Sequence, residues 1–356
     1  MAVKLLDRYI GTTVLSSTLV VMVVLLALFA FAAFAGELEK VGRGSYDALL
    51  ALQYTVLLLP RLAYQLFPIV ILLGAIIGLG LLASQSELIV VRAAGVSLWR
   101  IVWSVTKVGL LLLVLMLLVG EFVAPAAEFR AQSLRAEAIS GQASFRTDSG
   151  LWARDGNTVI HIRDLVTADQ VGRVSVYEFD RDNRLQTVTT AKSAQYTGAD
   201  WLLQQVQRSE ISSSGVATVQ PGQLRWESLL NPRLIGVVTV KPDYLSAPGL
   251  LRYIDYLTDN GLDASQYVLA LWKKAVMPLT TVIMIMLAVP FVFGPLRSVG
   301  VGQRIFAGTL FGIGYFLLDQ TASHLGLVYG LSPLMSVMVT PLLFSAVAYY
   351  LFRRVY

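Results

Sequence analysis

The sequence predicts an α-helical membrane protein with six transmembrane helices and an all-β, jelly-roll-like domain inserted between the third and fourth helices. Of its 356 residues, 56% are hydrophobic and only 14% are charged, whereas soluble globular chains have roughly 45–50% and about 25%. The apolar residues gather in six long runs toward the two ends of the chain. Between these runs the hydrophobic period shortens to two, which is typical of strands.

Each apolar run has about the length that crosses a hydrocarbon core of roughly 30 Å, at about 1.5 Å of rise per helical residue. The runs are Thr12–Phe34, Leu62–Ala83, Val108–Ala124, Val276–Phe293, Ile305–Ser323 and Pro333–Phe352. Pro60 and Pro68 fall near the start of the second run, where a helix tolerates them best. Because apolar residues already begin at Ala48, this helix is expected to begin earlier.

Lysine and arginine in the short loops orient the spans, because cytoplasmic loops carry an excess of both. One side collects Lys4, Arg8, Arg92, Arg100, Lys107, Arg297, Arg304, Arg353 and Arg354. The short segments on the opposite side hold only Lys40, Arg43 and Arg61. Both termini are therefore expected in the cytoplasm, and the polar region between spans three and four is expected outside it.

That polar region defines three predicted domains: helices 1–3 in 1–127, the β domain in 128–266 and helices 4–6 in 267–356. The turn signal Asp155–Asn157 precedes Thr158–Ile162, which predicts a hairpin. Further strands are expected at Val174–Phe179, Leu185–Thr190, Ser193–Thr197, Trp201–Ile211 and Val216–Val219. Short strands at this spacing indicate a sandwich or jelly roll. Ala247–Leu257 then has the pattern of a short amphipathic helix.

The loop between spans two and three is expected to form a short cytoplasmic helix within Ser84–Ser97. Ser84 or Ser86 can cap it, Glu87 suits its positive N-terminal end, and Gly95 can end it. Its apolar face is larger than a connector needs. Two interpretations stay open: a docking element that offers Glu87 to a basic residue of a soluble subunit, or a helix that lies on lipid.

Other patterns limit the chemistry. The sequence has no GxxxxGK[ST] loop, so any ATP site must belong to another chain. Without cysteine, and with only two distant histidines, neither a thiolate nor a clustered-histidine metal site is expected. Glu121 and Asp319 are acidic residues within spans. An ion or proton path would need more ionisable side chains around them than the spans contain.

Two glycine pairs allow close helix approach. Gly74 and Gly78 on span two are expected to serve packing within the chain. Gly308 and Gly312 on span five, followed by Gly314, leave a smooth face that suits a partner subunit.

Several cations are expected near the outer membrane boundary: Lys40, Arg43, Arg61, Arg130, Arg135, Lys273 and Lys274. Together they could capture an anionic head group through charge-assisted hydrogen bonds. The alternative is that they are ordinary interfacial anchors. Their bias to the outer side, against the usual charge rule, favours a phosphorylated lipid.

Five marker segments run in order along the chain: Leu6–Gly11, Gly44–Ala48, Ser86–Leu88, Leu151–Asn157 and Phe293–Ser298. Together they resemble the permease subunits of the lipopolysaccharide exporter, the LptF/LptG family, and its LptG branch more than its LptF branch. The resemblance covers essentially the whole chain.

The resemblance implies a non-catalytic subunit of an ATP-driven exporter in the bacterial inner membrane. It would extract lipopolysaccharide from the outer leaflet and pass it to a periplasmic bridge. The implied partners are an LptF-like permease, an LptB-like ATPase dimer that binds ATP and Mg, and an LptC-like single-span protein, with no nucleic acid. Spans one and five of the two permeases would line the lipid cavity and its lateral gates.

The resemblance also assigns residues. Glu87 matches the acidic residue of the family's coupling helix, so Glu87, Leu88 and Arg92 are expected to contact the ATPase. Lys40 and Arg135 match positions that hold the lipid's phosphates. Ala33 stands where some relatives carry a lysine, so that contact is expected to be absent or supplied by Arg43.

Two other functions stay open. A membrane enzyme acting on lipid-linked sugars would have to use Glu121, Asp319 and His324, and the isolated chain would turn over such a substrate. A membrane-anchored periplasmic adaptor would keep its function after deletion of Ser84–Ser97.

Overall fold

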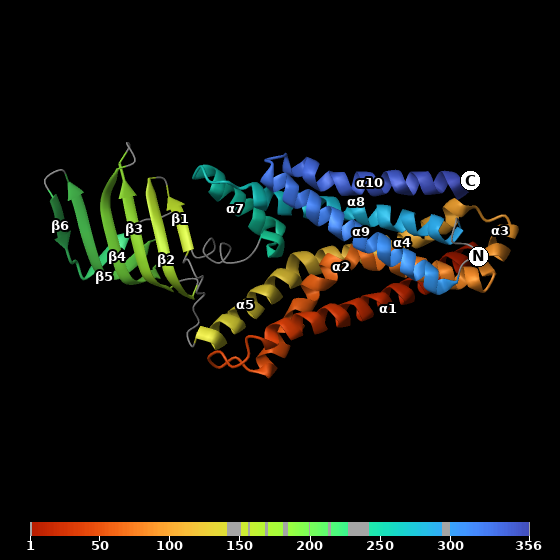
Figure 1. Ribbon diagram of the computed structural model, residues 1–356, viewed down its shortest axis with the longest axis horizontal. Helices are drawn as coiled ribbons and strands as arrows, with labels where there is room; N and C mark the ends of the chain where they lie inside the picture. The colour runs from red at the N-terminus through yellow and green to blue at the C-terminus, as the bar shows by residue number, and fades with distance from the viewer. Residues whose placement is uncertain are drawn as a thin grey trace. The chain divides into compact units, whose positions relative to one another are not determined.

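The computed structural model describes residues 2–140, 151–155, 157–167, 170–180, 184–198, 200–212, 215–226, 242–293 and 300–355. The chain is mostly helical and carries a separate antiparallel β-sheet (Figure 1). It divides into two compact units. The helical unit comprises Met1–Ala32, Leu58–Pro125 and Ser265–Tyr356; the sheet-containing unit comprises Ala33–Leu57 and Ala126–Ala264.

Nine α-helices, one short π-helix and one 3-10 turn are described in these ranges, in chain order. They are α1 (Ala2–Leu38), α2 (Ala48–Ser84), α3 (Glu87–Ala93), α4 (Leu98–Leu118), the π-helix η1 (Val119–Val123), α5 (Ala124–Ser140), the 3-10 turn η2 (Pro242–Tyr244), α7 (Ala247–Asp259), α8 (Ser265–Phe293), α9 (Val301–Val328) and α10 (Pro333–Val355). The amphipathic helix predicted at Ala247–Leu257 is confirmed as α7.

Five helical segments of the described chain are long and apolar enough to cross a membrane. They are Leu5–Leu38, Ala48–Ser84, Leu98–Ile139, Ser265–Phe293 and Pro333–Arg354. These coincide with five of the six predicted spans. The remaining predicted span, Ile305–Ser323, lies within α9, which is a continuous helix but does not reach the same apolarity.

Helix α2 begins at Ala48, as the apolar pattern predicts, so Pro60 and Pro68 lie inside the helix rather than near its start. Asp47 supplies the N-terminal cap, since its Oδ1 accepts the Leu50 N–H at 2.8 Å. Proline inside a long apolar helix is tolerated when neighbouring helices satisfy the backbone groups that it frees.

The core of the helical unit joins side chains of α1, α2, α4, α8 and α10. Ile71, Ile76 and Leu79 of α2 are fully buried in it, as is Met284 of α8. Helix α2 is therefore the most enclosed of the predicted spans in its second half, while much of α1 carries exposed apolar side chains.

Glycines of α2 bring α1 close, which confirms the predicted internal packing. A side chain at Gly74 would collide with Thr18, and one at Gly78 would meet the backbone of Val14. Only glycine lets two helix backbones approach in this way.

We expect Gly74→Val to destabilise the chain by about 1–3 kcal/mol, because the added methyl groups have no room beside Thr18. The matched control is Gly314→Val on α9, where nothing lies within 4 Å of an added Cβ. Thermal denaturation of the purified chain in detergent measures both. An equal loss of stability in the two variants would mean that the lower helix propensity of valine, and not the α1–α2 contact, causes the destabilisation.

The sheet consists of seven antiparallel strands among the described residues: β1 (Leu151–Asp155), β2 (Thr158–Thr167), β3 (Gln170–Phe179), β4 (Leu185–Tyr196), β5 (Trp201–Ser212), β6 (Gly215–Val219) and β7 (Gln223–Trp226). They pair in the order β1 to β6, and β7 pairs with β5. The hairpin predicted at Asp155–Asn157 is confirmed, with Asp155 opposite Thr158.

Two predictions for this region were wrong. Leu185–Thr190 and Ser193–Thr197 form one continuous strand, β4, because Ala191 and Lys192 also pair within the sheet's register. The stretch from Glu128 to Ser140, expected at the start of the β-rich segment, is helical as α5.

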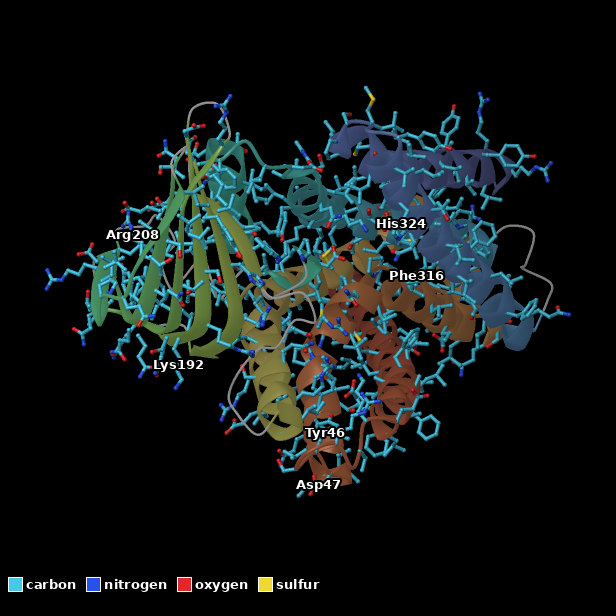
Figure 2. The ribbon with its side chains drawn as sticks, turned by 60° about the vertical axis from the view of Figure 1, so that its left-hand side comes forward. Tyr46, Asp47, Lys192, Arg208, Phe316 and His324 are labelled. Atoms are coloured by element: carbon cyan, nitrogen blue, oxygen red, sulfur yellow. The ribbon has the colours of Figure 1, made fainter. Side chains whose placement is uncertain are left out.

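One face of the sheet is apolar and buried, but its side chains do not alternate strictly. The buried pairs Val171 and Val174, Ala191 and Ala194, and Leu203 and Val206 are three residues apart. Arg173 and Gln205 lie in these intervals on β3 and β5 with φ of 46° and 52°. Because such a residue shifts the alternation by one, both halves of each strand keep their apolar side chains on the same face. Lys192 occupies the same interval on β4 and is exposed (Figure 2).

Candidate functional site

The predicted coupling segment is helix α3, which follows α2 after a short turn. Its C-terminus is built as expected. Gly95 has φ of 84°, its N–H donates to Arg92 O at 3.0 Å, and the Val96 N–H donates to Val91 O at 3.3 Å. This is the left-handed glycine motif that commonly ends helices.

The N-terminus of α3 differs from the prediction. Ser86 occupies the cap position with φ of 62°, and its side chain makes no capping hydrogen bond. The Ser84 hydroxyl donates instead to Leu81 O at 2.7 Å, within α2. The expected serine cap is therefore wrong, and Glu87 itself is the acidic group in the first turn.

Tyr9 orients the Glu87 carboxylate. Its hydroxyl donates to Glu87 Oε1 at 3.1 Å, and Glu87 is half-buried. The start of α1 is in turn fixed to α4 by Asp7, which accepts from Ser104 at 2.8 Å and from Lys107 at 3.2 Å. The predicted acidic residue is thus held in place by a part of the chain 78 residues away.

The three predicted coupling residues play different structural parts. Leu88 is 2% exposed and packs into the core of the helical unit, so it anchors α3. Arg92 is exposed in the last turn. Ile89 and Val90, which the sequence prediction did not name, are 50% and 67% exposed. They form the apolar surface beside Glu87. The continuous apolar run Leu88–Val91 could have predicted this surface, because a short helix cannot bury all four of these side chains.

Two of the predicted phosphate-binding cations, Lys40 and Arg135, meet at one carboxylate. We call the group around it the Glu37 cluster: Glu37, Lys40, Tyr46, Tyr54 and Arg135. Glu37 is 6% exposed. Its Oε1 accepts from Lys40 Nζ at 2.7 Å and from Arg135 Nη1 at 3.3 Å, and its Oε2 accepts from the Tyr46 hydroxyl at 3.0 Å. The structure thus brings Lys40 and Arg135, 95 positions apart in the sequence, to a single anion.

Arg135 is also held by an aromatic ring. Its Nη1 donates to the Tyr54 hydroxyl at 3.2 Å, and its guanidinium lies 5.2 Å from the centre of that ring. Gln132, one turn earlier on α5, donates to Tyr54 at 3.1 Å and to Glu128 at 2.8 Å. A guanidinium has five N–H donors, so Arg135 keeps donors for a further anion.

The turn between α1 and α2 completes this cluster. Tyr46 and Asp47 lie there (Figure 2), and Arg43 lies exposed three residues before Tyr46. Lys40 and Arg135, two of the predicted phosphate-binding cations, are therefore partly neutralised by Glu37. Among the described residues, no carboxylate lies within 4.0 Å of the Arg43 guanidinium. The prediction missed Glu37, although its position three residues before Lys40 was visible in the sequence.

Burial and the nearby Glu37 carboxylate raise the pKa of the Tyr46 phenol above its ordinary value of 10.0. The neutral phenol, which donates to Glu37, is therefore the form that the fold favours. This contribution to stability is complete below about pH 10 and is lost as the pH rises through the higher pKa of the folded state.

We expect Tyr46→Phe to destabilise the chain by about 1.5–3 kcal/mol, because a buried carboxylate loses a donor. Denaturation should also show that the native protein loses stability above about pH 10 and that the variant lacks most of this loss. Tyr9→Phe removes the corresponding hydrogen bond to Glu87, which is only half-buried, and should therefore cost less. A Tyr46→Phe variant with unchanged stability and pH profile would contradict the role given to this hydrogen bond.

The acidic residues of the predicted spans are paired with lysines of α8. Glu121, within the π-helix η1, lies 3.2 Å from Lys274 Nζ, and Asp319 lies 3.8 Å from Lys273 Nζ. Lys274 also donates to Gly120 O at 3.3 Å. Each of these two carboxylates therefore forms an ion pair between its own helix and α8. His324 is exposed on α9.

The glycines predicted to receive a partner helix are used within the chain. A side chain at Gly308 would meet Ile76 and Leu73, and one at Gly312 would meet Ile69, all on α2. The predicted partner-helix interface at Gly308 and Gly312 is therefore corrected: this face of α9 packs on α2. Gly314 lies about 200° around the helix from Gly312, and nothing lies within 4 Å of a Cβ added there, so that face of α9 is open. Phe316, which is also exposed (Figure 2), lies nearer to the Gly312 side.

No group of three or more histidine, cysteine or acidic side chains that could hold a metal occurs within the described ranges. Phe293–Ser298, one of the marker segments, lies outside the described residues except for Phe293.

Comparison with known proteins covers almost the whole chain. The family described as "Lipopolysaccharide export system permease LptF/LptG" matches residues 8–354. The chain is 38% identical over 355 residues to the lipopolysaccharide export system permease protein LptG of Escherichia coli strain K12, covering 98% of each chain. It is 34% identical over 354 residues to the LptG protein of Haemophilus influenzae, covering 99% of each. The chain therefore belongs to the lipopolysaccharide export system permease LptF/LptG family.

Proposed function

We propose that this chain is the LptG-type transmembrane permease subunit of an ATP-driven exporter that extracts lipopolysaccharide from the outer leaflet of the inner membrane. The observation that carries the proposal is the match to LptG proteins over both helical segments and the sheet region together. A relationship confined to the spans would support only a membrane location. The cargo is passed onward to a periplasmic bridge.

In this proposal α9 also crosses the membrane, as span five of six, and the three parts are 1–127, 128–266 and 267–356. Both termini are cytoplasmic and the sheet, as part of a jelly-roll-like domain, is periplasmic. The excess of lysine and arginine on the loops facing the termini supports this orientation. The intramembrane carboxylates Glu121 and Asp319 are compatible with membrane burial because each is paired with a lysine.

The chain supplies no nucleotide chemistry in this proposal. A partner ATPase dimer binds ATP and Mg, and α3 transmits its motion. Glu87 is offered to a basic residue of that ATPase, exposed Ile89 and Val90 add apolar contact area, and Arg92 lies at the far end of the helix. Because Leu88 anchors α3 in the core, a push on α3 moves the helical unit rather than the turn alone.

The cargo explains why energy is needed. A lipid loses about 0.8 kcal/mol per CH₂ that leaves the bilayer, so a lipid with several acyl chains loses tens of kcal/mol. An apolar cavity that the lipid enters sideways reduces this cost. The second permease and a single-span protein complete that cavity, with spans one and five of each permease as its lateral gates; much of α1 is apolar and exposed, which suits this use.

The Glu37 cluster is the proposed contact for the lipid's phosphates. Lys40 and Arg135 are held close together by one carboxylate, and each keeps donors that are not used within the cluster. A phosphate that approaches Lys40, Arg43 and Arg135 competes with Glu37 for the same N–H groups. The cluster therefore binds an anion reversibly, which a transporter requires.

Co-purification tests the proposal. The full chain, expressed with its candidate partners and purified by a tag, should bring down an ATPase dimer and a second permease, and the chain alone should hydrolyse no ATP. Nucleotide hydrolysis by the isolated chain, or turnover of a lipid-linked sugar by it, would contradict the proposal. An adaptor function would be favoured instead if deletion of Ser84–Ser97 left export intact.

A further inference from the structure

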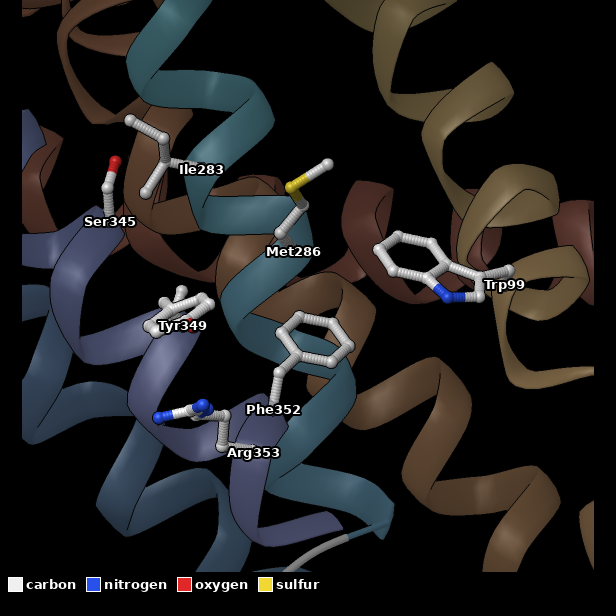
Figure 3. Close-up of a pocket in the computed structure, with 8 residues that line it drawn as sticks. Trp99, Ile283, Met286, Ser345, Tyr349, Phe352 and Arg353 are labelled. Carbon is white, nitrogen blue, oxygen red and sulfur yellow. The ribbon is translucent and has the colours of Figure 1, made fainter. Parts of the chain in front are cut away.

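The helical unit contains an apolar cleft that the proposed export function does not use. It has a volume of about 350 Å³, at the lower end of the roughly 300–1,000 Å³ of typical ligand sites. Three helices line it (Figure 3): Trp99 on α4, Ile283 and Met286 on α8, and Tyr349, Phe352 and Arg353 on α10.

The cleft is apolar along its length and charged at one end. Ser345 and Arg353 line opposite ends of it, and eight residues of helix separate them by about 12 Å. Ile283 lies at the level of Ser345, and Met286 lies between that end and Arg353 (Figure 3). A flexible hydrocarbon chain can lie in such a space, whereas a polar ligand would find few partners there.

The charged end is formed by Arg353, in the last turn of α10. Its guanidinium lies 5.5 Å from the centre of the Tyr349 ring, and no carboxylate within 4.0 Å neutralises it in the described part of the chain. Arg354, its neighbour, lies over the Tyr350 ring at 4.9 Å and does not line the cleft. The end of the cleft therefore offers an uncompensated cation beside an apolar space.

The aromatic residues agree with this arrangement. Trp99 and Phe352 stack with ring centres 5.9 Å apart and planes at 4°, and Trp99 is 56% exposed. Tryptophan and tyrosine prefer the level of lipid head groups, where one end of the side chain is apolar and the other is wet. The cleft thus begins at a membrane interface and extends toward the apolar interior.

We propose that this cleft binds one anionic glycerophospholipid of the cytoplasmic leaflet, with an acyl chain along Ile283 and Met286 and the phosphate at Arg353. Charge complementarity argues for a lipid with net negative charge, since a zwitterionic head group brings its own cation to Arg353. The inference rests on the cytoplasmic placement of this end of α10 in the proposed function. It does not depend on the cargo, so its test stands apart from export.

Native mass spectrometry of the full chain in detergent, titrated with phosphatidylglycerol or phosphatidylcholine, tests the site. The native chain should retain phosphatidylglycerol more strongly. Arg353→Gln should lower that retention about tenfold, because a charge-assisted contact to phosphate is lost. Arg354→Gln removes an equal charge one residue away and should change the retention of phosphatidylglycerol less than twofold. Ser345→Phe, which fills the apolar end while keeping the charge, should also lower it.

The proposal is overturned if the native chain retains both lipids equally, because the cleft would then be ordinary lipid-facing surface. It is equally overturned if Arg353→Gln and Arg354→Gln have the same effect, since only the general positive charge would then matter. Unchanged retention by Ser345→Phe would exclude an acyl chain in the cleft. Each readout is independent of ATP-driven export, whose failure would leave these results unaffected.

Discussion

Replacing Glu87 with arginine is expected to release the partner ATPase from the membrane subunit and to stop export. The carboxylate lies at the start of α3, half-buried and oriented by the Tyr9 hydroxyl at 3.1 Å. A basic residue of the partner that donates to this carboxylate would meet a cation instead. Losing an interface charge pair and gaining a repulsive one costs about 2–5 kcal/mol, and every 1.4 kcal/mol is about tenfold in affinity. Co-purified ATPase should therefore fall at least tenfold.

Two variants separate charge from geometry at this position. Tyr9→Phe removes the internal hydrogen bond but leaves the carboxylate, so ATPase binding should fall only about twofold to fivefold as the orientation is lost. Glu87→Gln keeps the shape of the side chain without its charge. Its loss of ATPase binding should lie between the losses of Tyr9→Phe and Glu87→Arg. ATPase binding that survives Glu87→Arg unchanged would show that α3 docks by other groups or lies on lipid.

Replacing Arg135 with glutamine is expected to lower the amount of lipopolysaccharide retained by the purified permease pair about tenfold, since a charge-assisted contact to phosphate is lost. Arg135 lies with Lys40 at the Glu37 carboxylate and is stacked over Tyr54. The matched control is Arg130→Gln, on the same helix and exposed, which has no contact with Glu37 and should change retention little.

Glu37→Gln distinguishes a binding role from a structural one. If Arg135 binds phosphate and Glu37 competes for it, Glu37→Gln should leave lipid retention unchanged or raise it severalfold. If Arg135 serves only to neutralise Glu37, Arg135→Gln and Glu37→Gln should both lose stability. The lipid that each variant retains should then fall only as far as its folded fraction falls. Thermal denaturation of each variant, measured beside retention, separates these results. Equal retention by Arg135→Gln and the native chain would remove Arg135 from the proposed lipid contact.

The helices were the most predictable part of the fold, because long apolar runs have few alternatives to a helix. Their ends were less predictable. Helix α2 extends to Ala48 because Asp47 caps it, and its prolines are accommodated inside. The end of α3 at Gly95 followed from local chemistry, whereas the cap expected at Ser86 did not form. A hydroxyl that can cap a helix can also donate to the preceding turn, and the sequence does not decide between them.

Contacts between distant segments were the least predictable. Lys40 and Arg135 were named as candidates, but their meeting point, Glu37, depends on how α1 and α5 come together. The glycines of α9 were recognised as a close-approach face, yet their partner is α2 of the same chain. Two glycines four residues apart show that a helix has a smooth face. Their spacing does not identify which helix packs on that face. In the sheet, left-handed Arg173 and Gln205 shift the alternation that the period of two assumes.

The proposed function requires a membrane chamber, built by this chain and a second permease, that a separate ATPase drives to lift lipid from the bilayer. Proteoliposomes that contain this chain, the second permease, the ATPase and labelled lipopolysaccharide measure it directly, with a soluble lipid acceptor outside. Transfer to the acceptor should require ATP and should be absent when this chain is omitted or carries Glu87→Arg. Transfer that proceeds equally without nucleotide, or without this chain, would contradict the account.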